Sequence, residues 1–131
     1  MSTEGNWPGM AAATRDYAGT STQDRILQII EAVDAHLDAA APEPFREDPM
    51  ANRWRRVTKV CEESGEVWRA LSAWDGENPR KGACGSREDV MEELADTACA
   101  ALFGIQHLTK DRNGTWVIFL AALAKAEGRL P

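Results

Sequence analysis

The segment that most constrains the fold is residues 94–105, which carry apolar or small side chains around nearly the whole circumference of a helix. A helix that is apolar on every side is normally buried, against a core or against another subunit. Asp96 is the single charge in this run. Because burying an unpaired carboxylate is costly, Asp96 is predicted to be protonated, paired with a cation or bound to a metal.

Helical periodicity also appears on both sides of this segment and predicts an all-α protein, a helical bundle of about four helices. The predicted helices are residues 21–40, capped by Ser21, residues 50–73, following Asp48-Pro49, residues 87–108, capped by Ser86, and residues 116–125, ended before Gly128. Two connectors rich in proline or glycine, residues 41–49 and 74–85, separate the first three helices. Residues 1–20 have no usable period and are predicted to be a flexible tail, so that residues 21–131 form a single domain.

Composition narrows the class of protein. The net charge of −6 argues against an extended nucleic-acid interface, which needs clustered Lys and Arg. The apolar stretches are too short for a membrane span, and the N-terminus lacks the pattern of a signal peptide. Cys61, Cys84 and Cys99 have no metal-ligand spacing and are predicted to be free thiols, two of them packed in helices. A cytoplasmic protein is therefore expected.

Two pairs of carboxylates suggest a metal site. Glu63 and Glu66 are three residues apart on one predicted helix, and Glu93 and Asp96 are three apart on the next. Residues at this spacing share a helix face, so two helices packed side by side would bring the four groups to one point. Carboxylates this close raise one another's pKa unless a cation lies between them. Mg²⁺ is predicted, with Mn²⁺ as a possible substitute, because hard divalent cations prefer carboxylate oxygen.

A structural interpretation competes with the metal site. Lys59 and Glu63 have the spacing of an ordinary ion pair on a solvated helix face, and Asp96 could pair with Lys59 or an arginine. That interpretation leaves unexplained why Glu93 lies one turn before Asp96 on the same face. A ferritin-type di-iron site needs Glu-x-x-His segments and a zinc site needs His or Cys ligands; the sequence has neither pattern. His36 has no acidic partner at ligand spacing, and His107 lies about three to four turns from Glu93, so both are left out of the predicted site.

The connector between the two acidic helices carries Arg80 and Lys81 beside glycines. These adjacent cations could close over a phosphate group, or they could form a solubilising loop tip. Together with an all-carboxylate magnesium site, they favour metal-assisted hydrolysis of a polyphosphate. Lys59, Arg80 and Lys81 are the predicted substrate-binding residues.

Residues 59–67, Lys-Val-Cys-Glu-Glu-Ser-Gly-Glu-Val, and residues 92–96, Glu-Glu-Leu-Ala-Asp, resemble a known paired signature. It is the Glu-Glu-x-x-Glu and Glu-x-x-Asp signature of the MazG-like family, which belongs to the all-α nucleoside triphosphate pyrophosphohydrolases. The Asn-Pro-Arg-Lys-Gly loop also resembles that of a short actinobacterial member. The resemblance covers about residues 53–108 and implies hydrolysis of a nucleoside or deoxynucleoside triphosphate to the monophosphate and pyrophosphate, as in house-cleaning of the nucleotide pool. It also implies a homo-oligomer, a dimer or a tetramer, with the site near an interface.

The same resemblance implies roles for individual residues. Glu63, Glu66, Glu93 and Asp96 match the ligands that hold Mg²⁺, while Glu62 matches the first glutamate of the signature. Glu62 and Glu63 are the predicted catalytic residues, with Glu62 orienting a water or acting as an outer base.

The nucleotide base is not specified by the sequence. Trp54, Trp68 and Trp74 are candidates for stacking on it, although core packing is predicted for the first two. The alternative to an enzyme is a non-catalytic helical interaction or regulatory module that retains the MazG-like fold.

Overall fold

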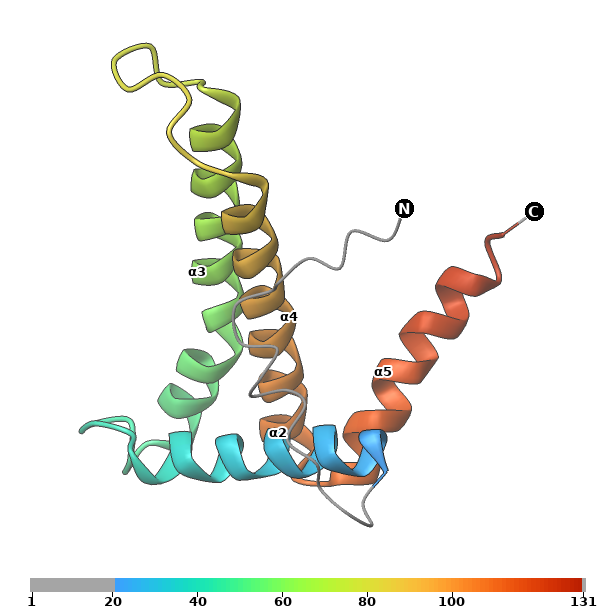
Figure 1. Ribbon diagram of the computed structural model, residues 1–131. Helices are drawn as coiled ribbons and strands as arrows, with labels where there is room; N and C mark the ends of the chain where they lie inside the picture. The colour runs from blue at the N-terminus through green and yellow to red at the C-terminus, as the bar shows by residue number, and fades with distance from the viewer. Residues whose placement is uncertain (1–20, 131) are drawn as a thin grey trace.

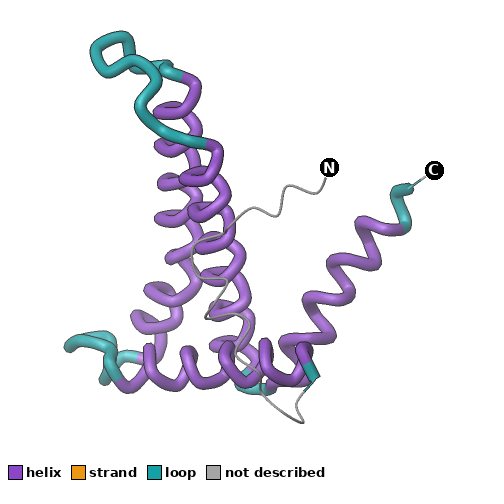
Figure 2. The backbone as a smooth tube through the Cα atoms, in the orientation of Figure 1, coloured by secondary structure: helices purple, strands orange, loops and turns teal. Residues whose placement is uncertain are grey.

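The computed structural model describes residues 21–130, so the predicted tail lies outside the described residues. Within that range the chain is helical and has no strand (Figure 2). The helices are α2 (Thr22–Ala39), α3 (Pro49–Asp75), α4 (Arg87–Thr109) and α5 (Arg112–Glu127). Across residues 21–130, the prediction of an all-α protein with about four helices is confirmed. None of the described helices has the length and apolarity needed to cross a membrane.

The caps predicted from sequence begin the first three helices. The Ser21 side chain accepts a hydrogen bond from a backbone N–H in the first turn of α2. The Asp48 carboxylate caps α3, with Pro49 in the first turn. Ser86 and Asp89 form a reciprocal capping box at the start of α4. Local side-chain chemistry therefore sets where these helices start.

The last helix begins earlier than the sequence pattern indicated. We predicted this helix over residues 116–125, but α5 begins at Arg112 because the Asp111 carboxylate accepts from the backbone N–H groups of Asn113 and Gly114. An acidic cap thus places the polar residues before Thr115 in the first turn of the helix.

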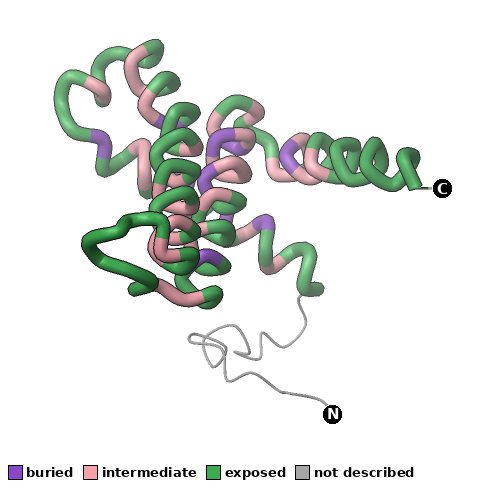
Figure 3. The backbone as a smooth tube through the Cα atoms, turned by 90° about the horizontal axis from the view of Figure 1, so that it is seen from above, coloured by how far each residue is buried: buried purple, intermediate pink, exposed green. Residues whose placement is uncertain are grey.

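The helices form a hairpin with a crossing helix and a projecting arm. α3 and α4 run antiparallel and side by side, joined at one end by the loop of residues 76–86 (Figure 1). α2 crosses the opposite end of this hairpin and contacts α4 and α5. α5 leaves the same end and diverges from the hairpin, and its C-terminal half is exposed (Figure 3).

A buried arginine joins the crossing helix to the hairpin. The Arg56 side chain is only 3% exposed and donates to Asp34 at 2.8 Å and to Asp38 at 2.9 Å. It also donates to the backbone carbonyl of Phe103 at 3.5 Å, so that α2, α3 and α4 meet at one guanidinium. Lys110 Nζ contacts the same two aspartates at 2.8 and 2.7 Å. Because both cations serve both acids, the buried charge is compensated.

The partners of Asp38 in this network lower its pKa. Burial disfavours its charged form, but hydrogen bonds from Lys110 and Asn52 outweigh that effect and lower the pKa of Asp38 to about 2. Asp38 therefore stays ionised at neutral pH and links α2 to α3 through Arg56 and Asn52.

The broad faces of the hairpin are exposed, which contradicts two predictions. Trp54 and Trp68, predicted to pack in the core, are each 66% exposed. The segment predicted to be buried on every side has Leu94 at 52% exposure, and Asp96 is exposed as well. The reason is the architecture, since α2 covers only one end of the hairpin and α5 diverges from it. All three cysteines are free, as predicted, but exposed rather than packed.

Candidate metal centre and its cavity

Glu63 on α3 and two acids on α4 come together in the middle of the hairpin. One carboxylate oxygen from each of Glu63, Glu93 and Asp96 lies within 4.8 Å of the others. We call these three residues the acidic cluster. Glu63 and Glu93 are partly buried between the helices, and Asp96 is exposed at the edge. Side-by-side packing of α3 and α4 thus brings together three of the four predicted metal ligands.

The fourth predicted ligand, Glu66, lies beside the acidic cluster but outside that set of mutually close oxygens. It forms an ion pair with Arg69, with 2.5 Å between Arg69 Nη2 and Glu66 Oε1. Its charge still acts on the cluster: partial burial, followed by repulsion from Glu66, Asp96 and Glu63, raises the pKa of Glu93. The neighbouring carboxylates therefore repel one another.

Asp96 is exposed, although it was predicted to be buried. The prediction that Asp96 is a buried charge is wrong, so the cost of burial no longer argues for a metal at this residue. The predicted alternative, a salt bridge from Lys59 or an arginine to Asp96, is not formed among residues 21–130 either. The remaining support for a metal at Asp96 is that it lies close to two other carboxylates. Burial, and after it the charge of Asp96, raises the pKa of the neighbouring Cys99 thiol.

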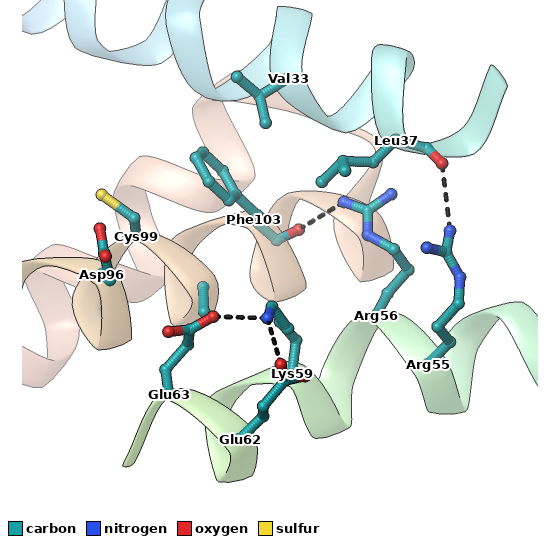
Figure 4. A pocket seen from close by; sticks show the side chains of 11 residues that line it. Val33, Leu37, Arg55, Arg56, Lys59, Glu62, Glu63, Asp96, Cys99 and Phe103 are labelled. Carbon is teal, nitrogen blue, oxygen red and sulfur yellow. Dashed lines mark hydrogen bonds and ion pairs between the residues drawn. The ribbon is translucent and has the colours of Figure 1, made fainter. Parts of the chain in front are cut away.

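Lys59 lies on the other side of Glu63. Its Nζ is 2.6 Å from Glu63 Oε1 and 2.9 Å from Glu62 Oε1 (Figure 4). Hydrogen bonds to Glu63 and then to Glu62 raise the pKa of Lys59. Glu62 itself is 62% exposed and its described partner is this lysine. The predicted catalytic pair is therefore bridged by a predicted substrate-binding residue.

A cavity of about 460 Å³ adjoins the acidic cluster (Figure 4). Its polar side includes Lys59, Glu62, Glu63 and Asp96. Its apolar side comes from α2 and α4 and consists of Val33, Leu37, Cys99, Ala100 and Phe103. Arg55 and Arg56 also line it, but their side chains already bond to the backbone carbonyls of Leu37 and Phe103, respectively. Carboxylates, one ammonium group and an aromatic ring thus share a single space.

The loop at the far end of the hairpin carries the other two predicted phosphate-binding residues. Arg80 and Lys81 are both exposed. Lys81 lines a second cavity, of about 480 Å³, together with Trp68 and Arg69. Arg80 donates its backbone N–H to the Asn78 side chain at 3.0 Å, which orders the turn but leaves the role of its guanidinium a prediction.

A second group with metal-ligand residue types has a different character. Oxygens of Asp34 and Asp38 and a ring nitrogen of His107 also lie within 4.8 Å of one another. Arg56 and Lys110 already neutralise both aspartates, and burial, followed by repulsion from Lys110, lowers the pKa of His107. This group is a structural ion network and offers a metal no uncompensated charge.

Sequence reasoning missed two parts of the site. Arg69 lies three residues after Glu66, so its pairing could have been predicted from helical spacing. The apolar side of the cavity had no comparable signal, because Val33 and Leu37 lie on a helix far from Phe103 in sequence. Only the crossing of α2 over the hairpin brings them together.

Comparisons with known proteins add no relative to this description. No family model matches the sequence, and neither a curated protein nor a solved structure matches the chain. The geometry of the site and the signature in the sequence are therefore the observations that bear on function.

Proposed function

We propose that this chain is a Mg²⁺-dependent nucleoside triphosphate pyrophosphohydrolase of the MazG-like type, which hydrolyses a nucleoside or deoxynucleoside triphosphate to the monophosphate and pyrophosphate. One observation carries the proposal: carboxylate oxygens of Glu63, Glu93 and Asp96 lie within 4.8 Å of one another and adjoin a cavity. Partial burial, and after it repulsion from Glu66, Asp96 and Glu63, raises the pKa of Glu93, and the repulsion supports a role for a cation there. Hard carboxylate oxygens suit Mg²⁺ or Mn²⁺.

The residues of the chain divide into three roles under this proposal. Glu63, Glu93 and Asp96 hold the cation, with Glu66 close enough to contribute charge. A bound Mg²⁺ neutralises phosphate charge and lowers the pKa of a coordinated water. Glu62 orients that water or accepts its proton from outside the cluster.

Phosphate and base would bind on either side of the acidic cluster. Lys59, on the polar side of the cavity, binds phosphate oxygen. Arg80 and Lys81 do not line this cavity and stay predicted phosphate-binding residues on the loop, where Lys81 lines the second cavity. The apolar side, which includes Phe103, offers an aromatic face for a planar base, a role that we had considered only for tryptophans. Of these, Trp74 is 41% exposed near the loop and stays a candidate for stacking.

A nucleotide panel tests the activity. Purified protein with Mg²⁺ should release pyrophosphate, and not orthophosphate, from at least one nucleoside triphosphate, and chelation of the metal should stop the reaction. Orthophosphate as the first product would place the cleavage at the wrong bond. If no nucleotide is turned over and calorimetry detects no Mg²⁺ binding, the enzyme proposal fails and the non-catalytic interaction module takes its place.

We also propose that the chain forms a homo-oligomer, a dimer or a tetramer. Exposed apolar side chains extend along two helices: Met50, Trp54, Val57, Trp68, Leu71 and Trp74 on α3, and Val117, Ile118, Leu120 and Leu123 on α5. Apolar surface this extensive commonly marks an interface. Cover by a second copy would bury the tryptophans that we expected to find in a core.

Light scattering after size exclusion tests the assembly. The mass should be at least twice the 14.4 kDa of one chain, and Trp54→Glu should lower it by placing a charge in the interface. Ala35→Glu, at an exposed position on α2, is the matched control and should leave the mass unchanged. A monomeric wild type at every concentration tried would contradict the proposed assembly.

A further inference from the structure

Among residues 21–130, Lys59 is the cationic side chain that forms an ion pair with the acidic cluster. Its ammonium nitrogen lies 2.6 Å from Glu63, inside the cluster, and 2.9 Å from Glu62, outside it. The lysine side chain is 48% exposed, whereas the Glu63 side chain is only 13% exposed. The mobile partner of this ion pair is therefore the lysine, since Glu63 is held between α3 and α4.

A divalent cation in the acidic cluster would need the same carboxylate that Lys59 occupies. Two cations on one carboxylate repel each other, and the repulsion is strongest where burial limits screening by water. Glu62 gives the lysine a second acceptor. Its side chain is 62% exposed and lines the same cavity. The lysine can thus leave Glu63 without losing its only acidic partner.

We propose that Lys59 is a resident counterion that competes with the divalent cation for Glu63, and that it is retained by Glu62 alone when the cation binds. This inference rests on the metal site proposed above. It gives Glu62 a role in holding the lysine, beside any role toward water. Once released from Glu63, the ammonium group faces the cavity and can donate a hydrogen bond to a phosphate oxygen. Metal binding therefore makes the lysine available to substrate.

The sign of one measurement separates this proposal from an ordinary surface ion pair. If Lys59 only stabilises the helix, its removal leaves metal affinity unchanged, or weakens it by loosening Glu63. If Lys59 competes with the metal, its removal strengthens metal binding. Exposed ion pairs contribute about 0.2–1 kcal/mol, so the gain should be roughly 1.4- to fivefold in affinity.

The experiment is a calorimetric titration of the metal-free protein with Mg²⁺ alone, at fixed ionic strength. Lys59→Met should bind Mg²⁺ roughly 1.4- to fivefold more tightly than wild type, while its KM for a nucleoside triphosphate rises. Lys59→Arg keeps the charge and should return the metal affinity to the wild-type value. Lys125→Met removes the same charge from α5 and should leave Mg²⁺ binding unchanged.

Failure of this inference differs from failure of the proposed function. If wild type binds Mg²⁺ and Lys59→Met binds it equally or more weakly, with an unchanged helical signal in circular dichroism, the counterion proposal is overturned and the metal site stands. A gain of equal size in Lys125→Met would also overturn it, since the effect would then be one of net charge. If wild type binds no Mg²⁺, the proposed metal site itself is wrong.

Discussion

Asp96→Asn is expected to reduce Mg²⁺-dependent release of pyrophosphate at least about 100-fold. The change keeps the size of the side chain and removes one of the three carboxylates that lie within 4.8 Å of one another. Loss of a residue that only supports a metal ligand typically costs 10- to 100-fold in affinity or activity, so the loss of a ligand should reach at least the upper end of that range. Initial rates at saturating nucleotide and Mg²⁺ measure the effect, and Glu93→Gln should behave similarly.

Stability measurements separate this loss from unfolding. Because the three carboxylates repel one another, removing one charge should leave the melting temperature of the metal-free protein unchanged or higher. Added Mg²⁺ should raise the melting temperature of wild type, because a ligand that binds only the native state stabilises it, and this rise should be smaller in Asp96→Asn. Glu92→Gln, one residue before Glu93 and exposed, is the matched control and should keep wild-type activity. Wild-type turnover by Asp96→Asn would remove this residue from the metal site.

Arg56→Met is expected to lower the free energy of unfolding by about 3–5 kcal/mol, the usual cost of breaking a buried ion pair by removing one partner. The Arg56 side chain is 3% exposed and bonds to Asp34 and Asp38 on α2. The Asp34 side chain is 6% exposed, and without Arg56 its remaining close ion pair would be that with Lys110 at 2.8 Å, whose side chain is half exposed. Urea denaturation at fixed protein concentration measures the change.

A second charge pair provides the control for this prediction. Arg87 pairs with Glu88 at 3.2 Å, but the two side chains are 63% and 51% exposed. Exposed pairs contribute at most about 1 kcal/mol, so Arg87→Met should change the free energy of unfolding by less than that. If Arg56→Met proves as mild as Arg87→Met, the network does not hold α2 onto the hairpin.

Local features of the helices could be predicted because their causes lie within a few residues. Ser21, Asp48 and Ser86 cap the helices that they were predicted to begin, since a capping side chain bonds to backbone two or three residues ahead. The spacing of Glu93 and Asp96 is equally local, as residues three apart share a helix face. The cap at Asp111 was overlooked, although its signal was of the same kind.

Three features depended on packing between distant segments. The contacts of Arg56 with Asp34, the apolar side of the cavity and the exposure of Asp96 follow from how α2 and α5 meet the α3–α4 hairpin. Hydrophobic pattern shows that a face is apolar, but it cannot show which neighbour covers it. Trp54 and Trp68 illustrate the limit, since apolar periodicity predicted a core and the described chain leaves them exposed.

The four helices, the starts of the first three and the spacing of the carboxylates on two helix faces follow from the sequence alone, because each depends on contacts within one turn. Packing of α3 against α4 brings Glu63, Glu93 and Asp96 together. The ion pairs of Glu66 with Arg69 and of Lys59 with Glu62 and Glu63 are local, because each joins residues three or four apart on α3. The meeting of the three acids depends on the register between α3 and α4, which is set by packing along their whole length. Asp96 was expected to need a cation because it would be buried, but packing leaves it exposed. What favours a cation beside Asp96 is its repulsion of the neighbouring carboxylate of Glu93.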